Sequence, residues 1–302
     1  MRDTMKRNQL IPISTLAIAF ALAGCGASPS APSGEAKAKP TSAVPTPPSG
    51  PDPHVHTEGD GHDHGSGGHD HTHEHASTAK FGLEVINASK GFRAGSPIEL
   101  RVAVRNNESG AIQKSFDTVH DKKLHLIVVN EGLTTFQHLH PTMDGDGFWS
   151  QRITLPHGGR FLVFADGGVG GEKFSAGTEL SAEGDATPNP SFALSAEAKA
   201  DGIIARVVEG AKLPLSDHAH VTIRLSNPAG WEPYLGAPGH LIMVRQDGKE
   251  FMHAHPKGAM KDGRVVFDAH FHEKGVYRTW AQFQRGGKVL TFPFTLEVGD
   301  AE

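Results

Sequence analysis

The chain has 302 residues, a formal net charge of −5 with its histidines neutral, and 37% hydrophobic residues. The negative charge argues against nucleic acid as a partner, and the length allows two ordinary domains. There are 20 His, 36 Gly and 20 Pro but a single Cys. An internal disulfide is therefore excluded, and any folded part must be stabilised by its hydrophobic core.

Residues 1–25 have the layout of a secretory signal. A basic start precedes the apolar run LIPISTLAIAFALA, and the segment ends in Leu-Ala-Gly-Cys at Cys25. This ending resembles the lipobox of bacterial lipoproteins, in which the cysteine becomes the lipidated N-terminus. The apolar run is short for crossing about 30 Å of hydrocarbon. We therefore expect a lipoprotein signal peptide and a lipid-anchored protein of the cell envelope. It would lie on the periplasmic side of the inner or outer membrane, or on the outer face of the cytoplasmic membrane.

Residues 26–79 are expected to be a disordered tether. They are rich in Pro, Ala, Ser and Gly, a composition that cannot bury a core. Within the tether, residues 54–75 interleave histidines with acidic residues and glycines, and resemble the His-rich loops of bacterial periplasmic zinc-binding proteins and cation transporters. Such a tract would bind Zn, Cu or Ni weakly and repeatedly. Its histidines are His54, His56, His62, His64, His69, His71, His73 and His75.

From Lys80 onward the chain predicts an all-β fold. Short runs rich in β-branched and aromatic residues, such as PIELRVAV and GRFLVFAD, are separated by Gly, Asn, Asp and Pro, the pattern of strands and turns. A second such series follows GDATPNP at residues 184–190. We predict two tandem β-sandwich domains, residues 80–184 and residues 190–300.

The two series also align with each other, which indicates an internal duplication of a whole domain. KLHLIVVNEGLTTFQHLHP matches PGHLIMVRQDGKEFMHAHP without a gap, and GRFLVFAD matches GVYRTWAQ after one extra residue. At a constant offset of 115 residues, the histidines of the first copy recur in the second; the two triplets are His125, His138, His140 and His240, His253, His255.

Each triplet has the spacing of a metal site. Residues two apart on a strand face the same side, so His138 and His140 project together. A hairpin would place His125 beside them, with neighbouring Cβ atoms about 5 Å apart. Three imidazoles so placed suit copper or zinc, and the absence of a free thiolate excludes a blue-copper centre. Met143 and Met252 do not correspond between the copies, and are more simply read as packing residues.

The alternative is that these histidines are not ligands but ordinary exposed or core side chains, hydrogen-bonded where they are buried. Retention of all three at identical spacing in both copies favours ligands. The pairs His218/His220 and His270/His272 have no counterpart in the first domain. We interpret them as surface residues of strands, and the alternative is a metal site with more ligands in the second domain. His120 and His157 read as loop residues, His120 being the better candidate ligand.

The HLIVV…F.HLHP and YLGA.GHL segments resemble a group of bacterial secreted or lipoprotein domains described as metal-associated envelope proteins. The resemblance covers roughly residues 80–299 and implies an immunoglobulin-like or cupredoxin-like sandwich, with metal handling at the six triplet histidines. Gly132, His138, His140 and Asp144 also partly imitate the first motif of cupin metalloenzymes. The second cupin motif is not recognisable, so an enzyme is the minority interpretation.

The sequence therefore predicts an envelope lipoprotein that binds copper or zinc for buffering, chaperoning or delivery, with a metal transporter or another envelope protein as partner. The alternative is a structural or protein-interaction sandwich protein in which only the tract at 54–75 touches metal. A cupin-like metalloenzyme is the third hypothesis.

Overall fold

The computed structural model describes residues 80–187 and 190–300. All of them belong to one compact unit, residues 72–302. The expected signal peptide, its Cys25, the tether and the histidine tract lie outside the described residues. Within the described residues, no helix is long and apolar enough to cross a membrane.

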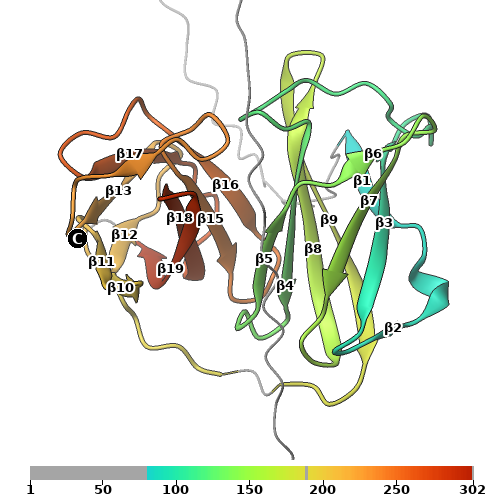
Figure 1. The fold of residues 1–302 in the computed structure, drawn as a ribbon, viewed down its shortest axis with the longest axis horizontal. Helices are drawn as coiled ribbons and strands as arrows, with labels where there is room; N and C mark the ends of the chain where they lie inside the picture. The colour runs from blue at the N-terminus through green and yellow to red at the C-terminus, as the bar shows by residue number, and fades with distance from the viewer. Residues whose placement is uncertain (1–79, 188–189, 301–302) are drawn as a thin grey trace, which may run out of the picture. The chain divides into compact units, whose positions relative to one another are not determined.

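The described chain is all-β, as the sequence predicts, and its strands fall into two series (Figure 1). Domain 1 holds β1 (Phe81–Val85), a short 3-10 helix η1 (Ala88–Lys90), β2 (Phe92–Arg93), β3 (Pro97–Asn106), β4 (Leu124–Asn130), β5 (Phe136–Leu139), β6 (Thr142–Met143), β7 (Phe148–Thr154), β8 (Gly159–Val169) and β9 (Glu172–Glu183). Domain 2 holds β10 (Glu197–Ala200), β11 (Ile203–Val207), β12 (Lys212–Pro214), β13 (Ala219–Leu225), β14 (Trp231–Glu232), β15 (His240–Arg245), β16 (Phe251–Pro256), β17 (Arg264–Ala269), β18 (Gly275–Arg285) and β19 (Lys288–Gly299).

Domain 1 is a sandwich of two sheets with immunoglobulin strand order. One sheet runs β1-β3-β7-β6, and the other runs β2-β9-β8-β4-β5. In immunoglobulin terms, the first is an ABED sheet and the second contains the G, F and C strands with one further strand beside C. The cores of both domains form between such sheets, as the alternating burial of β9 and β13 shows.

Domain 2 repeats the same pairings. The hairpin β4–β5 corresponds to β15–β16, and the antiparallel pair β8–β9 corresponds to β18–β19. The short parallel strands β2 and β12 pair with the last strand of their respective domains. In domain 2 the two sheets are joined into one continuous path, because β16 pairs with both β15 and β17.

The central strands β4 and β15 are buried on both faces. Every residue of β4 is buried, and so is every residue of β15 except Arg245. Leu126 and Leu241 face the cores of their own domains. The opposite faces join a third apolar cluster that draws on both domains: Ile127, Val129, Leu133, Leu162, Phe164, Ile242, Val244 and Trp280. The two sheets that contain β4 and β15 therefore pack against each other.

Two stacked aromatic pairs lie at this interface, and they occupy equivalent positions in the two domains. Phe136 of β5 stacks on Trp280 of β18, with ring centroids 4.6 Å apart and planes at 12°. Phe164 of β8 stacks on Phe251 of β16 at 4.6 Å and 4°. Each contact joins the hairpin strand of one domain to the long central strand of the other. The interface thus has an approximate two-fold character that follows from the duplication.

Candidate metal centre

The predicted hairpins form, and their register places the histidines on the interface side. Ile127 pairs with His138, and Ile242 pairs with His253. Because alternate residues of a strand share a face, His125 and His240 lie on the same side as Ile127 and Ile242, which belong to the interdomain cluster. The first two histidines of each triplet therefore point toward the partner domain.

Four histidines from the two domains meet in one group. One ring nitrogen from each lies within 4.8 Å of one from each of the others, and the members are His125, His138, His240 and His253. His125, His240 and His253 are buried, and His138 is half-buried. This arrangement differs from the two separate triplets that the sequence predicts. The structure brings two members of each triplet into one shared cluster.

His140 and His255, the third member of each triplet, are not in this group of four. The His140 ring lies 5.0 Å from the ring of His125 and 4.7 Å from that of His138. His255 lies 5.3 Å from His253, and His120 of domain 1 stacks on it at 4.8 Å. The Nε2 atoms of His120, His140 and His255 are buried without a hydrogen-bond partner. These three imidazoles flank the cluster.

The outer nitrogens of the first pair of cluster histidines are held by backbone carbonyls. His125 Nε2 donates to the Val119 carbonyl oxygen at 3.0 Å, and His240 Nε2 donates to that of Tyr234 at 3.0 Å. Val119 and Tyr234 occupy equivalent turns, each closed by a short bridge to Lys122 or Ala237. A carbonyl oxygen can only accept, so both Nε2 atoms carry the proton and both Nδ1 atoms keep a lone pair.

The other two cluster histidines are held by side chains of the opposite domain. His138 Nδ1 donates to Gln282 Oε1 at 2.7 Å, and His253 Nδ1 donates to Asp166 Oδ2 at 3.1 Å. Gln282 Nε2 donates in turn to Thr291 Oγ1, and this bond orients the amide of Gln282 so that its Oε1 faces His138. The Nε2 atoms of His138 and His253 therefore keep their lone pairs. Asp166 pairs with His125 on the neighbouring strand, as Gln282 pairs with His240.

Four lone pairs consequently point into one buried space. His125 Nδ1 lies 3.1 Å from His138 Nε2, and His240 Nδ1 lies 3.0 Å from His253 Nε2. A tetrahedral metal with metal–nitrogen bonds of about 2.0 Å separates its nitrogens by roughly 3.3 Å. Leaving each buried acceptor unsatisfied costs about 1–3 kcal/mol, a cost that a cation bound between the four would remove. The cluster could hold a metal ion.

Burial keeps these imidazoles in the form that binds metal. Desolvation, followed by repulsion from the neighbouring imidazoles, lowers the pKa of His138 and of His253 well below 6.5. The same causes lower the pKa of His240 to about 2. Burial raises the pKa of Asp166 to about 6, so above that pH its carboxylate accepts from His253. Neutral imidazole is the metal-binding form.

The other sequence candidates have different roles in the structure. Met143 and Met252 pack against the domain cores. His157 donates to the Gly158 carbonyl and accepts from Thr135, which makes it a loop-ordering residue. Asp144 closes a turn, accepting from the backbone amides of Asp146 and Phe148 and pairing with Arg101 at 3.0 Å.

Sequence reasoning missed the orienting residues and the joining of the two domains in one cluster. The alignment of GRFLVFAD with GVYRTWAQ does place Asp166 opposite Gln282, and in both copies the polar residue follows an aromatic residue and an alanine. The runs LHLIV and HLIMV lack the polar alternation of a half-buried strand, which is a signal that both faces are covered. Those two observations together would have indicated a shared interface.

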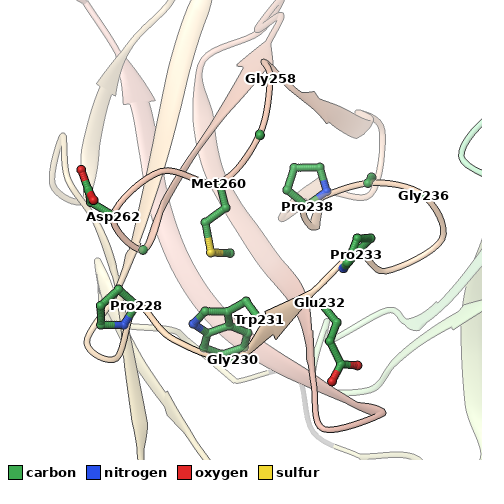
Figure 2. A pocket seen from close by; sticks show the side chains of 13 residues that line it. Pro228, Gly230, Trp231, Glu232, Pro233, Gly236, Pro238, Gly258, Met260 and Asp262 are labelled. Atoms are coloured by element: carbon green, nitrogen blue, oxygen red, sulfur yellow. The ribbon is translucent and has the colours of Figure 1, made fainter.

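Domain 2 also contains a cavity of about 580 Å³ apart from the cluster (Figure 2). Trp231 and Met260 line it together with several prolines and glycines. It is lined by two carboxylates, Asp262 and Glu232, of which Glu232 already accepts from Gln284 and from the backbone of Gly287. This cavity offers no converging set of ligand atoms.

A family model described as a domain of unknown function, DUF8832, matches residues 78–184 and 198–300. The chain belongs to this family. No curated protein matches it. Among solved structures, it is similar to a Salmonella alpha-2-macroglobulin mutant at 12% identity and a TM-score of 0.25, covering 74% of this chain but only 15% of that one.

Two smaller proteins give similar values. The fibronectin(III)-like modules of Clostridium thermocellum CbhA match at 11% identity and a TM-score of 0.22, over 72% of this chain and 93% of theirs. A titin fragment, A168169, matches at 11% identity and a TM-score of 0.20, over 74% of this chain and 98% of its own. The fold assignment rests on the strand order described above.

Proposed function

We propose that this chain binds one divalent transition-metal ion, copper or zinc, between its two domains. The observation that carries the proposal is the orientation of the four cluster histidines. Each donates its only N–H outward, so four neutral nitrogens are left to face one another at distances close to those of a metal site. Histidines oriented by carbonyl and carboxylate partners in this way are typical of metal ligands.

The ligand set favours metal storage or transfer over catalysis. Four protein nitrogens fill a tetrahedron and leave no open coordination position for a substrate, which is the difference between closed sites and catalytic ones. A set of imidazoles with one nearby carboxylate suits Zn²⁺ and Cu²⁺. Met143 and Met252, whose thioethers would suit Cu(I), pack against the domain cores instead. We therefore propose a buffering, chaperone or delivery function rather than an enzyme.

The rest of the proposal concerns the location of the protein. The lipobox at Cys25 would anchor the chain in the cell envelope, and the His-rich tract at residues 54–75 would capture ions for the cluster or for a partner transporter. Replacing Cys25 with Ala should abolish incorporation of labelled fatty acid and move the protein from the membrane fraction to the soluble one. Unchanged labelling would contradict lipid anchoring while leaving the metal proposal intact.

The test of metal binding uses the full chain, purified without an affinity tag, with the eight histidines of residues 54–75 replaced by Ser. We call this variant the tract-silenced chain. Titration with Zn²⁺ and with Cu²⁺, followed by calorimetry and elemental analysis, should give about one tightly bound ion per chain. The variant that also carries His138→Ala and His253→Ala should bind none tightly. If the tract-silenced parent binds no ion, the folded domains are structural or interaction modules, and only the tract touches metal.

A further inference from the structure

A solvent-connected pocket of about 500 Å³ leads to one side of the four-histidine cluster. Most of its lining comes from domain 2, and Asp166, Lys173, Phe174 and Ser175 come from domain 1. Its lining includes a set of metal-binding side chains: Asp166, His253, His255, Asp268, His270 and His272. His253 is a cluster member and Asp166 orients it, so the pocket borders the cluster.

The histidines of the pocket become progressively more buried toward the cluster. His270 and His272 are exposed, His255 is half-buried, and His253 is only 6% exposed. The His255 ring lies 5.3 Å from that of His253, with the two planes at 26°. The buried Nε2 of His255 has no hydrogen-bond partner. His255 is therefore intermediate in burial between the exposed pair and His253, the cluster ligand beside it.

The exposed pair is held by neighbouring groups that leave ligand atoms available. His270 Nδ1 donates to the Asp217 carbonyl, so its Nε2 keeps a lone pair. His272 Nδ1 lies 3.3 Å from an Asp217 carboxylate oxygen. These two histidines have no counterpart in domain 1, and both line the pocket.

The positive charge of Lys173, which lines this pocket, disfavours binding of a divalent metal ion there. Lys173 Nζ donates to His255 Nδ1 at 3.3 Å, and burial, followed by the charge of Lys173, lowers the pKa of His255. Asp268 is partly neutralised by Lys257, whose Nζ lies 3.4 Å from its carboxylate. A site with a lysine beside its central ligand holds a divalent cation weakly, which suits transit rather than storage.

We propose that this pocket is the route by which a divalent metal ion reaches the cluster. His270 and His272 take up the ion from solution or from the His-rich tract, His255 receives it, and His253 draws it into the four-histidine site. Lys173 slows the passage. This inference rests on the proposed function, because it needs an ion bound at the cluster.

The experiment measures the rate at which Co²⁺ or Zn²⁺ loads the full, tract-silenced chain in a stopped-flow instrument. His255→Ala and the double variant His270→Ala, His272→Ala should load about tenfold more slowly or worse, with the same final stoichiometry. Lys173→Gln should load faster, because removing a positive charge from an access path raises the rate of cation arrival. Lys199→Gln is the control, an exposed lysine of the same domain that does not line the pocket, and should load at the parent rate.

The outcomes separate this inference from the proposed function. A parent chain that binds no metal overturns both. A parent that binds one ion, with loading rates unchanged in the pocket variants, overturns the route alone. If His255→Ala lowers the stoichiometry or the equilibrium affinity as much as the rate, His255 is a permanent ligand and the transit role is wrong.

Discussion

Asp166 accepts a hydrogen bond from His253 Nδ1 across the domain interface at 3.1 Å, although the two residues are 87 positions apart in the sequence. In the equivalent contact, Gln282 of domain 2 accepts from His138 Nδ1 of domain 1 at 2.7 Å. The duplicated site is therefore asymmetric at one point, since one orienting group bears a charge and the other is neutral. A single carboxylate partly balances the charge of a divalent ion at four neutral ligands.

This asymmetry predicts what the orienting residues contribute to affinity. Asp166→Asn keeps an acceptor for His253 but removes the charge, and should weaken Zn²⁺ binding by about 10- to 100-fold. Gln282→Glu adds a second carboxylate, and should strengthen metal binding while lowering the stability of the metal-free chain. Competition titrations against a chelator of known affinity measure both. Equal affinities in the parent and Asp166→Asn would rule out an electrostatic role for the carboxylate.

A shared site predicts that one substitution in either domain removes all tight binding by the folded domains. His138→Ala and His253→Ala should each lower the bound metal from about one ion per tract-silenced chain to none, with a loss of affinity above the roughly 100-fold expected for an orienting residue. Two independent triplets would instead go from two ions to one. Elemental analysis after gel filtration distinguishes these results, and His218→Ala should retain the parent stoichiometry.

The apolar interface should control metal binding without supplying a ligand. Trp280 is 4% exposed and stacks on Phe136. Trp280→Ala should cost about 3–5 kcal/mol of packing free energy, which loosens one domain from the other and so weakens Zn²⁺ binding. Urea unfolding and calorimetry measure the two effects. Val221→Ala, in the core of domain 2, is the control, and should lower domain stability with a smaller loss of affinity.

The buried histidines predict that acid destabilises the metal-free protein. Burial, followed by repulsion from His125 and Lys122, lowers the pKa of His140 to about 3. Burial, followed by the charge of Lys173, lowers the pKa of His255 to about 4. The unfolded chain takes up protons at these residues below about pH 6.5 and the folded chain does not. The free energy of unfolding should therefore fall as the pH drops from about 6.5 toward 4.

Asp166 acts in the opposite direction, because burial raises its folded pKa to about 6. It is one group against several histidines, so the net effect of acid remains destabilising. Urea midpoints measured from about pH 7.5 down to about pH 4.5 should decrease, and the decrease should begin near pH 6.5. A midpoint that rose on acidification would contradict this sign.

Much of the fold is determined by local sequence. Alternating and continuous apolar runs separated by Gly, Asn and Asp predict the strands, because side-chain period and turn chemistry act over a few residues. The hairpins at β4–β5 and β15–β16 were predicted for the same reason, and the structure confirms them. Constant spacing in two copies can be read without coordinates, and it singled out six histidines, four of which the structure brings together.

Tertiary structure alone decided which histidines meet. Each hairpin places His125 or His240 beside two further histidines, and no local rule states which of these turns toward a partner from the other domain. Packing of β4, β5 and β8 on β15, β16 and β18 selected His138 and His253, and left His140 and His255 at the sides. The contacts to Asp166 and Gln282 also cross that interface. A shared buried cluster is a property of how two domains pack, which depends on surfaces far apart in the chain.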